Sequence, residues 1–454
     1  MAAATISPAP RPAAMPGAPG PMALVDGARL PLVFIGFGLA AFAAAACWLT
    51  LETWRGIPSL HHPRIVGLAH LWLPGFLLSI CLGASYQLLP VLLGSPLPVS
   101  ATWRWIHLLL HTAGVLSLVT GLATGNYVGA AIGGSAIAAG ACGLLIVTVR
   151  TFRASRRRDA VALSLPLSAG WLAATTSAGL ILAANRHHPF LPWSVLDLLK
   201  AHAHLGLGGY FLTLIQGVSF QLVPLFTLGQ LQHPERVARG LLASQVGLAM
   251  LIPGLAWAQP GLRIAGAGLV IIGLAFSGSA LVRTLAARRR QPVDASLRGY
   301  LAGLGLLATG AIGGLALLFP AATTHPGTTL AYALLLVTGG LTCTVLGMLG
   351  RILPFLVWMK CYGPRVGRGP VPLASNLAPP GLESTWWRLQ LAAVAILTTA
   401  AALGSESGFA AGGALLLLAT VLWLVHAARI LRHLVNAGES GPLPVPTGAS
   451  HPSP

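Results

Sequence analysis

Residues 70–90 read HLWLPGFLLSICLGASYQLLP, and residues 204–224 read HLGLGGYFLTLIQGVSFQLVP. Both stretches begin with His-Leu and end on Gln-x-x-Pro at the same spacing. Residues 334–354, LLLVTGGLTCTVLGMLGRILP, form a weaker third copy, which begins with Leu334 in place of the histidine and keeps a glycine five residues later, at Gly339. A repeat at this interval indicates three related structural units.

These stretches belong to a very apolar chain of 454 residues, of which 55% are hydrophobic and 8% are charged, with a mean hydropathy of +0.78. Soluble domains are about 25% charged, which excludes a soluble enzyme. The sequence predicts an all-α integral membrane protein, because twelve apolar segments approach the ~20 residues that a spanning helix needs. The predicted spans are 30–51, 64–92, 104–124, 127–148, 161–184, 200–228, 239–258, 261–285, 298–319, 327–358, 387–404 and 407–433.

The repeat divides the twelve predicted helices into three four-helix pseudo-repeats, in which helices two, six and ten are equivalent. Parallel repeats of this kind predict pseudo-threefold symmetry about the membrane normal. The shortest predicted connections, Gly125-Asn126 and Gln259-Pro260, separate the third helix from the fourth in the first two units. The predicted divisions are a flexible arm (1–29), three units (30–158, 159–290 and 291–435) and a flexible tail (436–454).

The basic residues predict the orientation. The formal net charge is +18, from 27 Lys and Arg against 9 Asp and Glu. Most of the bases fall in loops after even-numbered helices, including the runs Arg156–Arg158 and Arg288–Arg290. By the positive-inside rule this predicts a multi-pass protein of a bacterial-type inner membrane with both termini cytoplasmic. The same placement makes membrane lipid the expected partner and argues against nucleic acid.

The cysteines and carboxylates argue against thiolate sites and against proton chemistry by carboxylates inside the membrane. The five cysteines occur singly and form no CxxC, so neither a disulfide framework nor a thiolate zinc site is indicated. All nine carboxylates are expected in loops, helix ends or tails. A proton pump or proton-coupled carrier usually needs a carboxylate inside the membrane, and acid–base catalysis by paired carboxylates needs two.

Histidine is the polar residue that enters the predicted spans. An imidazole in hydrocarbon costs free energy unless it is hydrogen-bonded or ligates a metal, so each such histidine is either a structural residue or a ligand. His107 and His111 are one turn apart on one helical face, whereas His202 and His204 project to opposite sides. The five intramembrane candidates are His70, His107, His111, His202 and His204.

His70 and His204 occupy equivalent repeat positions at the same expected depth. Two facing helices could therefore offer two imidazoles to one planar ligand. Haem suits this arrangement, because it is largely apolar and takes axial histidines from opposite faces. We expect His70 and His204 to bind b-type haem, with His202, and His111 or His107, available to a second haem or to copper.

A second group of histidines precedes the equivalent helices. His61-His62-Pro63 stands before helix two, His187-His188-Pro189 before helix six and Thr324-His325-Pro326 before helix ten. Imidazoles without thiolates suit copper or zinc. Contacts to haem propionates, or plain exposure to solvent, are the other interpretations of these loops.

Twelve helices in three four-helix arcs, with metal-ligating histidines on helices two, six and ten, is the plan of subunit I of the haem–copper oxidases, which this sequence resembles. The stretch AHAHLGLGGYFLT at residues 201–213 resembles the His-x-His haem-ligand segment of that superfamily, and its continuation to Leu222-Val223-Pro224 resembles the C-type oxidases. His70 resembles the helix-two ligand of the low-spin haem. The resemblance implies the subunit I fold, haem, and other membrane or cytochrome subunits as partners.

The sequence departs from that family at the oxygen-reducing site. Its His-x-His lies on helix six instead of helix ten, and helix seven lacks the histidine pair that would bind copper. The NnrS family, twelve-helix membrane proteins with haem and copper linked to nitrosative stress, is a functional analogue. Three functions stay open: electron transfer or binding of NO or O2 within a respiratory complex, an active terminal oxidase or NO reductase with unusual ligands, and a transporter or structural subunit without metal.

Overall fold

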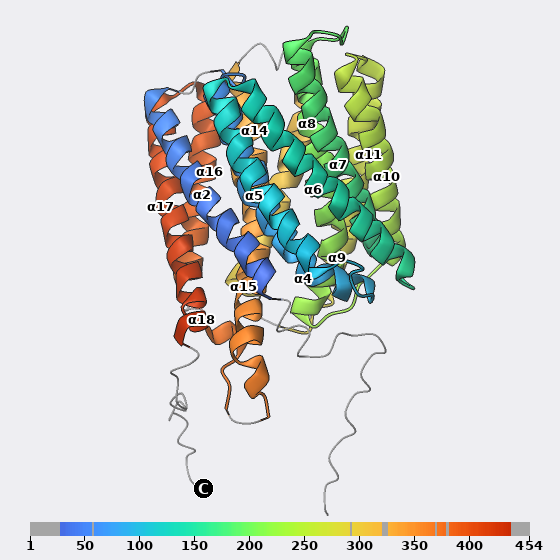
Figure 1. The fold of residues 1–454 in the computed structure, drawn as a ribbon, viewed down its shortest axis with the longest axis vertical. Coiled ribbons are helices and arrows are strands. Elements are labelled where there is room, and N and C mark those ends of the chain that lie inside the picture. Colours follow the sequence, from blue (N-terminus) through green and yellow to red (C-terminus); the bar gives the residue numbers. More distant parts are fainter. Residues whose placement is uncertain are drawn as a thin grey trace, which may run out of the picture.

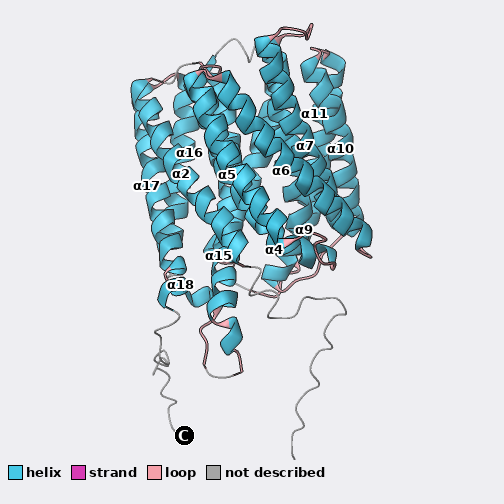
Figure 2. Cartoon of the chain, in the orientation of Figure 1, coloured by secondary structure: helices cyan, strands magenta, loops and turns pink. Residues whose placement is uncertain are grey.

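The fold is a single bundle of long helices. The computed structural model describes residues 28–56, 59–290, 293–319, 326–367, 370–377 and 381–436, and all regular structure within them is helical. Twelve of the described helices are long and apolar enough to cross a membrane, and they lie side by side along one direction (Figures 1 and 2). The predicted class, a twelve-helix all-α membrane protein, is confirmed.

The spans follow the predicted order closely. Both short connections fall where the sequence put them, because α5 ends at Thr124 before α6 begins at Tyr127, and α10 ends at Ala256 before α11 begins at Pro260. The spanning elements are α2 (Arg29–Arg55), α3–η1–α4 (Pro63–His70, Leu71–Leu78, Ser79–Leu93), α5 (Ala101–Thr124), α6 (Tyr127–Ala154), α7 (Ala160–His187), α8–η2–α9 (Val195–His204, Leu205–Leu212, Thr213–Thr227), α10 (Pro234–Ala256), α11 (Pro260–Ala286), α12 (Ala295–Ala316), α14–η3–α15 (Pro326–Leu334, Leu335–Leu341, Thr342–Cys361), α16 (Leu382–Leu403) and α17 (Glu406–Leu431).

The helix ends follow from ordinary capping chemistry. The Asp159 side chain accepts a hydrogen bond from the Ala162 N–H at 3.0 Å at the start of α7, and the Asn126 side chain caps α6 in the same way. Side-chain oxygens satisfy N–H groups that the first turn leaves without partners. α5 ends at Gly125, whose φ of 75° lies in the left-handed region that glycine tolerates.

The three central helices share one irregularity. Each contains a π-helical segment that begins directly after the first residue of the sequence repeat: η1 after His70, η2 after His204 and η3 after Leu334. A π segment carries one residue more than the surrounding α-helix accommodates and often marks a functional site. Its recurrence at equivalent positions is what three related units predict. The boundaries of the units stay a prediction.

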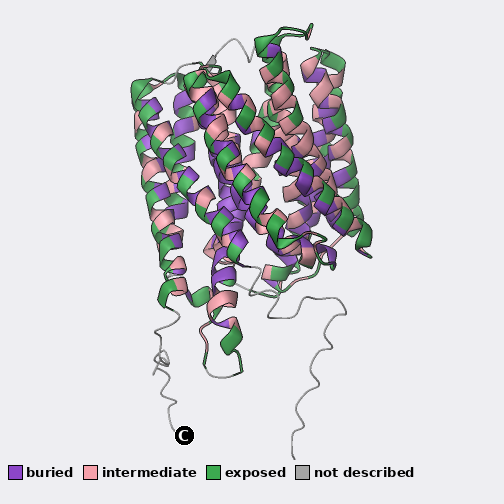
Figure 3. Ribbon diagram, viewed as in Figure 1, coloured by how far each residue is buried: buried purple, intermediate pink, exposed green. Residues whose placement is uncertain are grey.

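Helix pairs approach closely through glycine. A Cβ atom added at Gly114 of α5 would lie 2.9 Å from the Gly133 carbonyl oxygen of α6, and one at Gly247 of α10 would lie 2.7 Å from that of Gly266 in α11. Without side chains at these crossings the backbones can approach each other, as is common between membrane helices. Figure 3 shows the result, with buried residues gathered where helices face one another.

The Gln-x-x-Pro end of the repeat makes polar contacts near the starts of α7 and α12. Arg157 donates to the Gln221 side chain at 3.0 Å and pairs with Asp159 at 2.8 Å. In the third unit Arg351 itself occupies the Gln position and pairs with Asp294, which caps α12. Partial burial acts to raise the pKa of Asp159, but hydrogen bonds from Arg157 and the Ala162 N–H, together with the Arg157 charge, hold it below its usual value.

Candidate functional site

Two of the predicted histidines lie next to each other. The rings of His70, at the end of α3, and His202, in the last turn of α8, have centroids 6.3 Å apart and planes inclined by 17°. Both side chains are half-buried. His70 directly precedes η1, and His202 lies three residues before η2 begins at Leu205, so the pair lies where both helices change their geometry.

The hydrogen bonds fix which nitrogen is free. Nδ1 of His70 donates to the Val66 carbonyl oxygen at 2.8 Å, and Nδ1 of His204 donates to that of Lys200 at the same distance. A backbone carbonyl that accepts from Nδ1 fixes the tautomer and leaves Nε2 as a lone-pair donor, the usual second shell of a ligating histidine. Nδ1 of His202 is buried without a hydrogen-bond partner.

The pairing differs from the one expected from the repeat. The sequence placed His204 opposite His70, but within the described ranges the ring in contact with His70 is that of His202. A rotational arrangement of the three predicted units would account for this difference. In a cyclic arrangement one unit meets the next through different positions, so equivalent residues do not face each other away from the axis. His204 keeps a free Nε2 but makes no ring contact with His70 in the described chain.

His107 and His111 lie apart from this pair and have protein partners. The Tyr86 hydroxyl and Nδ1 of His107 are 2.7 Å apart, and the Ser79 hydroxyl and Nε2 of His111 are 2.8 Å apart. Both histidines are 1% exposed. These bonds between the second and third helices of the first unit account for both buried rings without a metal. Ligation by either residue stays a prediction.

The second unit repeats the His111 contact with a different residue. Gln245 of α10 donates to the Thr213 hydroxyl at 2.8 Å. Thr213 stands at the repeat position of Ser79, and Gln245 at that of His111. Because an amide is a poor ligand for haem iron or copper, the shared element is an interhelical hydrogen bond.

We therefore expect His111→Gln to fold and to keep any metal that the wild type binds. The amide can donate to Ser79 as Gln245 does to Thr213, so the free energy of unfolding should change by about 1 kcal/mol or less. Metal content and the melting temperature of the purified variant check this. His111→Leu is the matched control, which removes the bond and should melt at a lower temperature. Loss of metal in the glutamine variant would restore His111 as a ligand.

The His-Pro loops give no ligand cluster. Nδ1 of His62 accepts from the Arg64 N–H at 3.3 Å and so caps α3, and the rings of His187 and His188 lie 4.5 Å apart. His325 lies outside the described residues. In the part of the chain that the structure describes, no group of three or more His, Cys, Asp or Glu is arranged to hold a metal ion.

His426 and Glu52 are buried ionisable residues whose burial the sequence analysis did not predict. His426 of α17 is 2% exposed, and its Nδ1 has no partner. Its position within the predicted span 407–433 is the same signal that identified the other histidines. Glu52 was expected at a helix end and does lie in the last turn of α2, but its side chain is fully buried 3.7 Å from Arg64. Hydropathy alone does not show such burial.

Comparison of the sequence with protein-family models finds no match, and comparison with curated proteins finds none either. Membership of the haem–copper oxidase superfamily therefore stays an expectation from the resemblance. The candidate site depends on the geometry of His70 and His202 and on the twelve-helix fold that brings their two helices together.

Proposed function

We propose that this membrane protein binds one b-type haem between His70 and His202 and uses it for electron transfer or for binding a diatomic gas. The observation that carries the proposal is the near-parallel pair of imidazole rings, 6.3 Å apart, on two helices of different repeats. A ligand bound there would be held by two units of the fold at once.

The separation suits two axial ligands of one metal. Two imidazoles that ligate from opposite sides, with metal–nitrogen bonds of about 2.0 Å, have ring centres roughly 6 Å apart. The hydrogen bond from His70 to Val66 already orients one of the two rings for this role.

The surroundings also fit a bound group. Nδ1 of His202 is buried without a hydrogen-bond partner, and burying such an atom costs free energy. A bound ligand would offset this free-energy cost.

Gly179 supports the position of His202. A Cβ atom at Gly179 of α7 would lie 3.2 Å from Cε1 of the His202 ring, so the absence of a side chain lets the ring lie against this helix. When bound between His70 and His202, haem would supply a one-electron couple or an iron that binds a diatomic gas. The protein's own part is to orient both imidazoles and to keep water away from them.

The location and partners of the protein belong to the same proposal. We place it in a bacterial-type inner membrane with both ends cytoplasmic, because the runs Arg156–Arg158 and Arg288–Arg290 fall in loops on one side. Electron transfer would require a donor and an acceptor, which points to other membrane or cytochrome subunits. Copper stays a prediction without a ligand cluster among the described residues.

Spectroscopy of the purified chain tests the proposal. We expect a reduced-minus-oxidised difference spectrum of a six-coordinate b-type haem and iron at about one atom per chain. An oxidase or reductase would also contain copper at a similar level and would consume O2 or NO. A folded protein without haem or iron would contradict the proposal and favour the transporter or structural function.

A further inference from the structure

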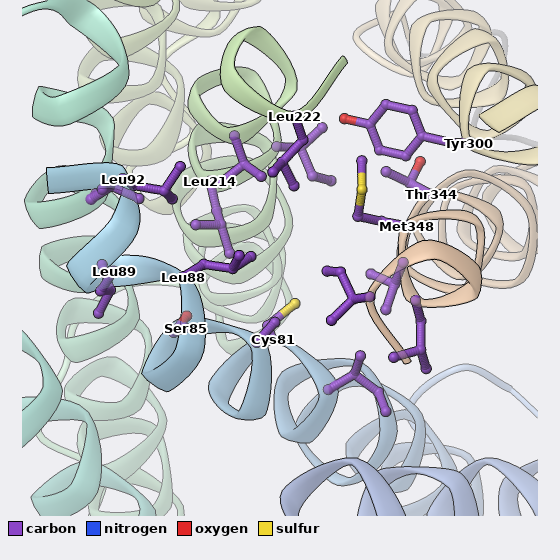
Figure 4. Close-up of a pocket in the computed structure, with 18 residues that line it drawn as sticks. Cys81, Ser85, Leu88, Leu89, Leu92, Leu214, Leu222, Tyr300, Thr344 and Met348 are labelled. Carbon is purple, nitrogen blue, oxygen red and sulfur yellow. The ribbon is translucent and has the colours of Figure 1, made fainter. Parts of the chain in front are cut away.

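An apolar cavity of about 90 Å³ lies between the three helices that carry the sequence repeat. Figure 4 shows that α4, α9 and α15 surround it, with Cys81, Leu88, Leu222 and Met348 among its lining residues. It belongs to the continuous core of the bundle. No motif in the sequence indicated it.

The lining repeats with the sequence. The same four positions of the repeat contribute a side chain from each of the three units, and they form one face of a helix. In repeat order the sets are Ile80, Leu214 and Thr344; Cys81, Ile215 and Val345; Ala84, Val218 and Met348; and Leu88, Leu222 and Ile352. Four complete sets around one space place the cavity on the pseudo-threefold axis.

Symmetry explains why side chains leave this space. Side chains interdigitate when large residues face small ones, but equivalent positions meet each other on an axis. The three units have only partly overcome this, since Ala84 and Val218 are small where Met348 is long. A void on the axis is the consequence of three similar faces meeting there.

The cavity offers little hydrogen bonding to water. The Thr344 hydroxyl donates to the Gly340 carbonyl oxygen at 2.7 Å, and the hydroxyls of Tyr300 and Ser219 bond each other at 2.6 Å. Two of the lining groups that could bind water are therefore already satisfied. A water needs two to four polar partners, whereas cavities lined by aliphatic groups stay dry and accept apolar guests.

We propose that this axial cavity is a binding site for small uncharged apolar molecules of the size of xenon or a dissolved diatomic gas. Its volume and its apolar lining admit such guests. The polarisable sulfur atoms of Cys81 and Met348 on its wall favour such molecules through dispersion. The site does not depend on haem binding and goes beyond the function proposed above.

Xenon is the probe, and crystals of the full chain pressurised with xenon provide the measurement. We expect an anomalous peak between Cys81, Val218 and Met348 in the wild type. Ala84→Leu should reduce this peak to the noise, because the larger side chain occupies the space. Val218→Leu, which adds bulk from the second unit, should do the same if the first variant does not fold. Val91→Leu, at a 55% exposed position on the same helix, is the matched control and should keep the peak.

The outcomes are decisive in both directions. A xenon peak that is present in the wild type and in Val91→Leu but absent from the filled variant supports the site. A folded wild type without xenon there, ordered water in the cavity, or an alkyl chain threaded through it would overturn the proposal. An unchanged peak in both filled variants would do so as well. None of these results depends on whether the protein contains haem.

Discussion

His70→Ala and His202→Ala should each abolish haem binding, while His204→Ala should retain it. If both rings ligate one iron, removing either leaves at most a five-coordinate haem with weak retention. Loss of a second-shell partner alone commonly costs 10–100-fold in metal affinity, so loss of a ligand should lower haem content at least tenfold. The haem-to-protein absorbance ratio of purified variants measures this.

The His204 variant makes the test sharp. The repeat alone pairs His70 with His204, and that arrangement requires His204→Ala to lose the haem. The ring contact between His70 and His202 requires the opposite. If His202→Ala retained haem and His204→Ala lost it, ligation by His70 and His202 would be refuted. The pairing of His70 with His204 would then be reinstated. His233→Ala, in the loop before α10 where its ring pairs with Glu235, is the control that should leave the spectrum unchanged.

Gly266→Leu should be among the most destabilising substitutions in the protein. A Cβ atom there would lie 2.7 Å from the Gly247 carbonyl oxygen and against the Leu251 backbone, which cannot move aside as a flexible side chain can. The α10–α11 pair would have to separate along its length. Overpacking costs about 1–3 kcal/mol where neighbours adjust and more where backbone must shift. We expect a strong loss of folded protein and of its melting temperature in detergent.

Gly268→Leu, two residues along the same helix, is the matched control. A Cβ atom at Gly268 meets nothing within 4 Å, so its leucine would project into open space or lipid. Helix propensity and hydrophobicity change equally in the two variants. Similar melting temperatures would show that the close approach of α10 and α11 is not what holds this pair together.

Much of the fold is predictable from the sequence because the membrane imposes a simple rule. Each span must satisfy its own backbone hydrogen bonds within a helix of about 20 apolar residues. Hydropathy therefore gives the number of spans and their order along the chain. Even the short breaks at Gly125 and Gln259 were found, since glycine, asparagine and proline are the residues that end or begin helices there. The repeat also located the three helices that carry a π segment.

The candidate site was predictable only in part. The sequence identified His70 and His202 as intramembrane imidazoles, but the partner of His70 depends on how neighbouring units are rotated, which no residue pattern states. The hydrogen bonds of His107 and His111 required knowing that Tyr86 and Ser79 face them across a helix interface. The axial cavity could not be predicted from the sequence either, because residues from several separate helices line it.

The π-helical segments also bear on how the chain arose. Each begins at the first residue after the same repeat position, although only two of the three follow a histidine. Segments of this kind correspond to one extra residue in a helix. If the three predicted units descend from one ancestral four-helix unit, a single insertion before its triplication accounts for all three segments, whereas later insertion would require three separate events at one place. The widened turn is then older than the divergence that left imidazoles on two copies and leucine on the third.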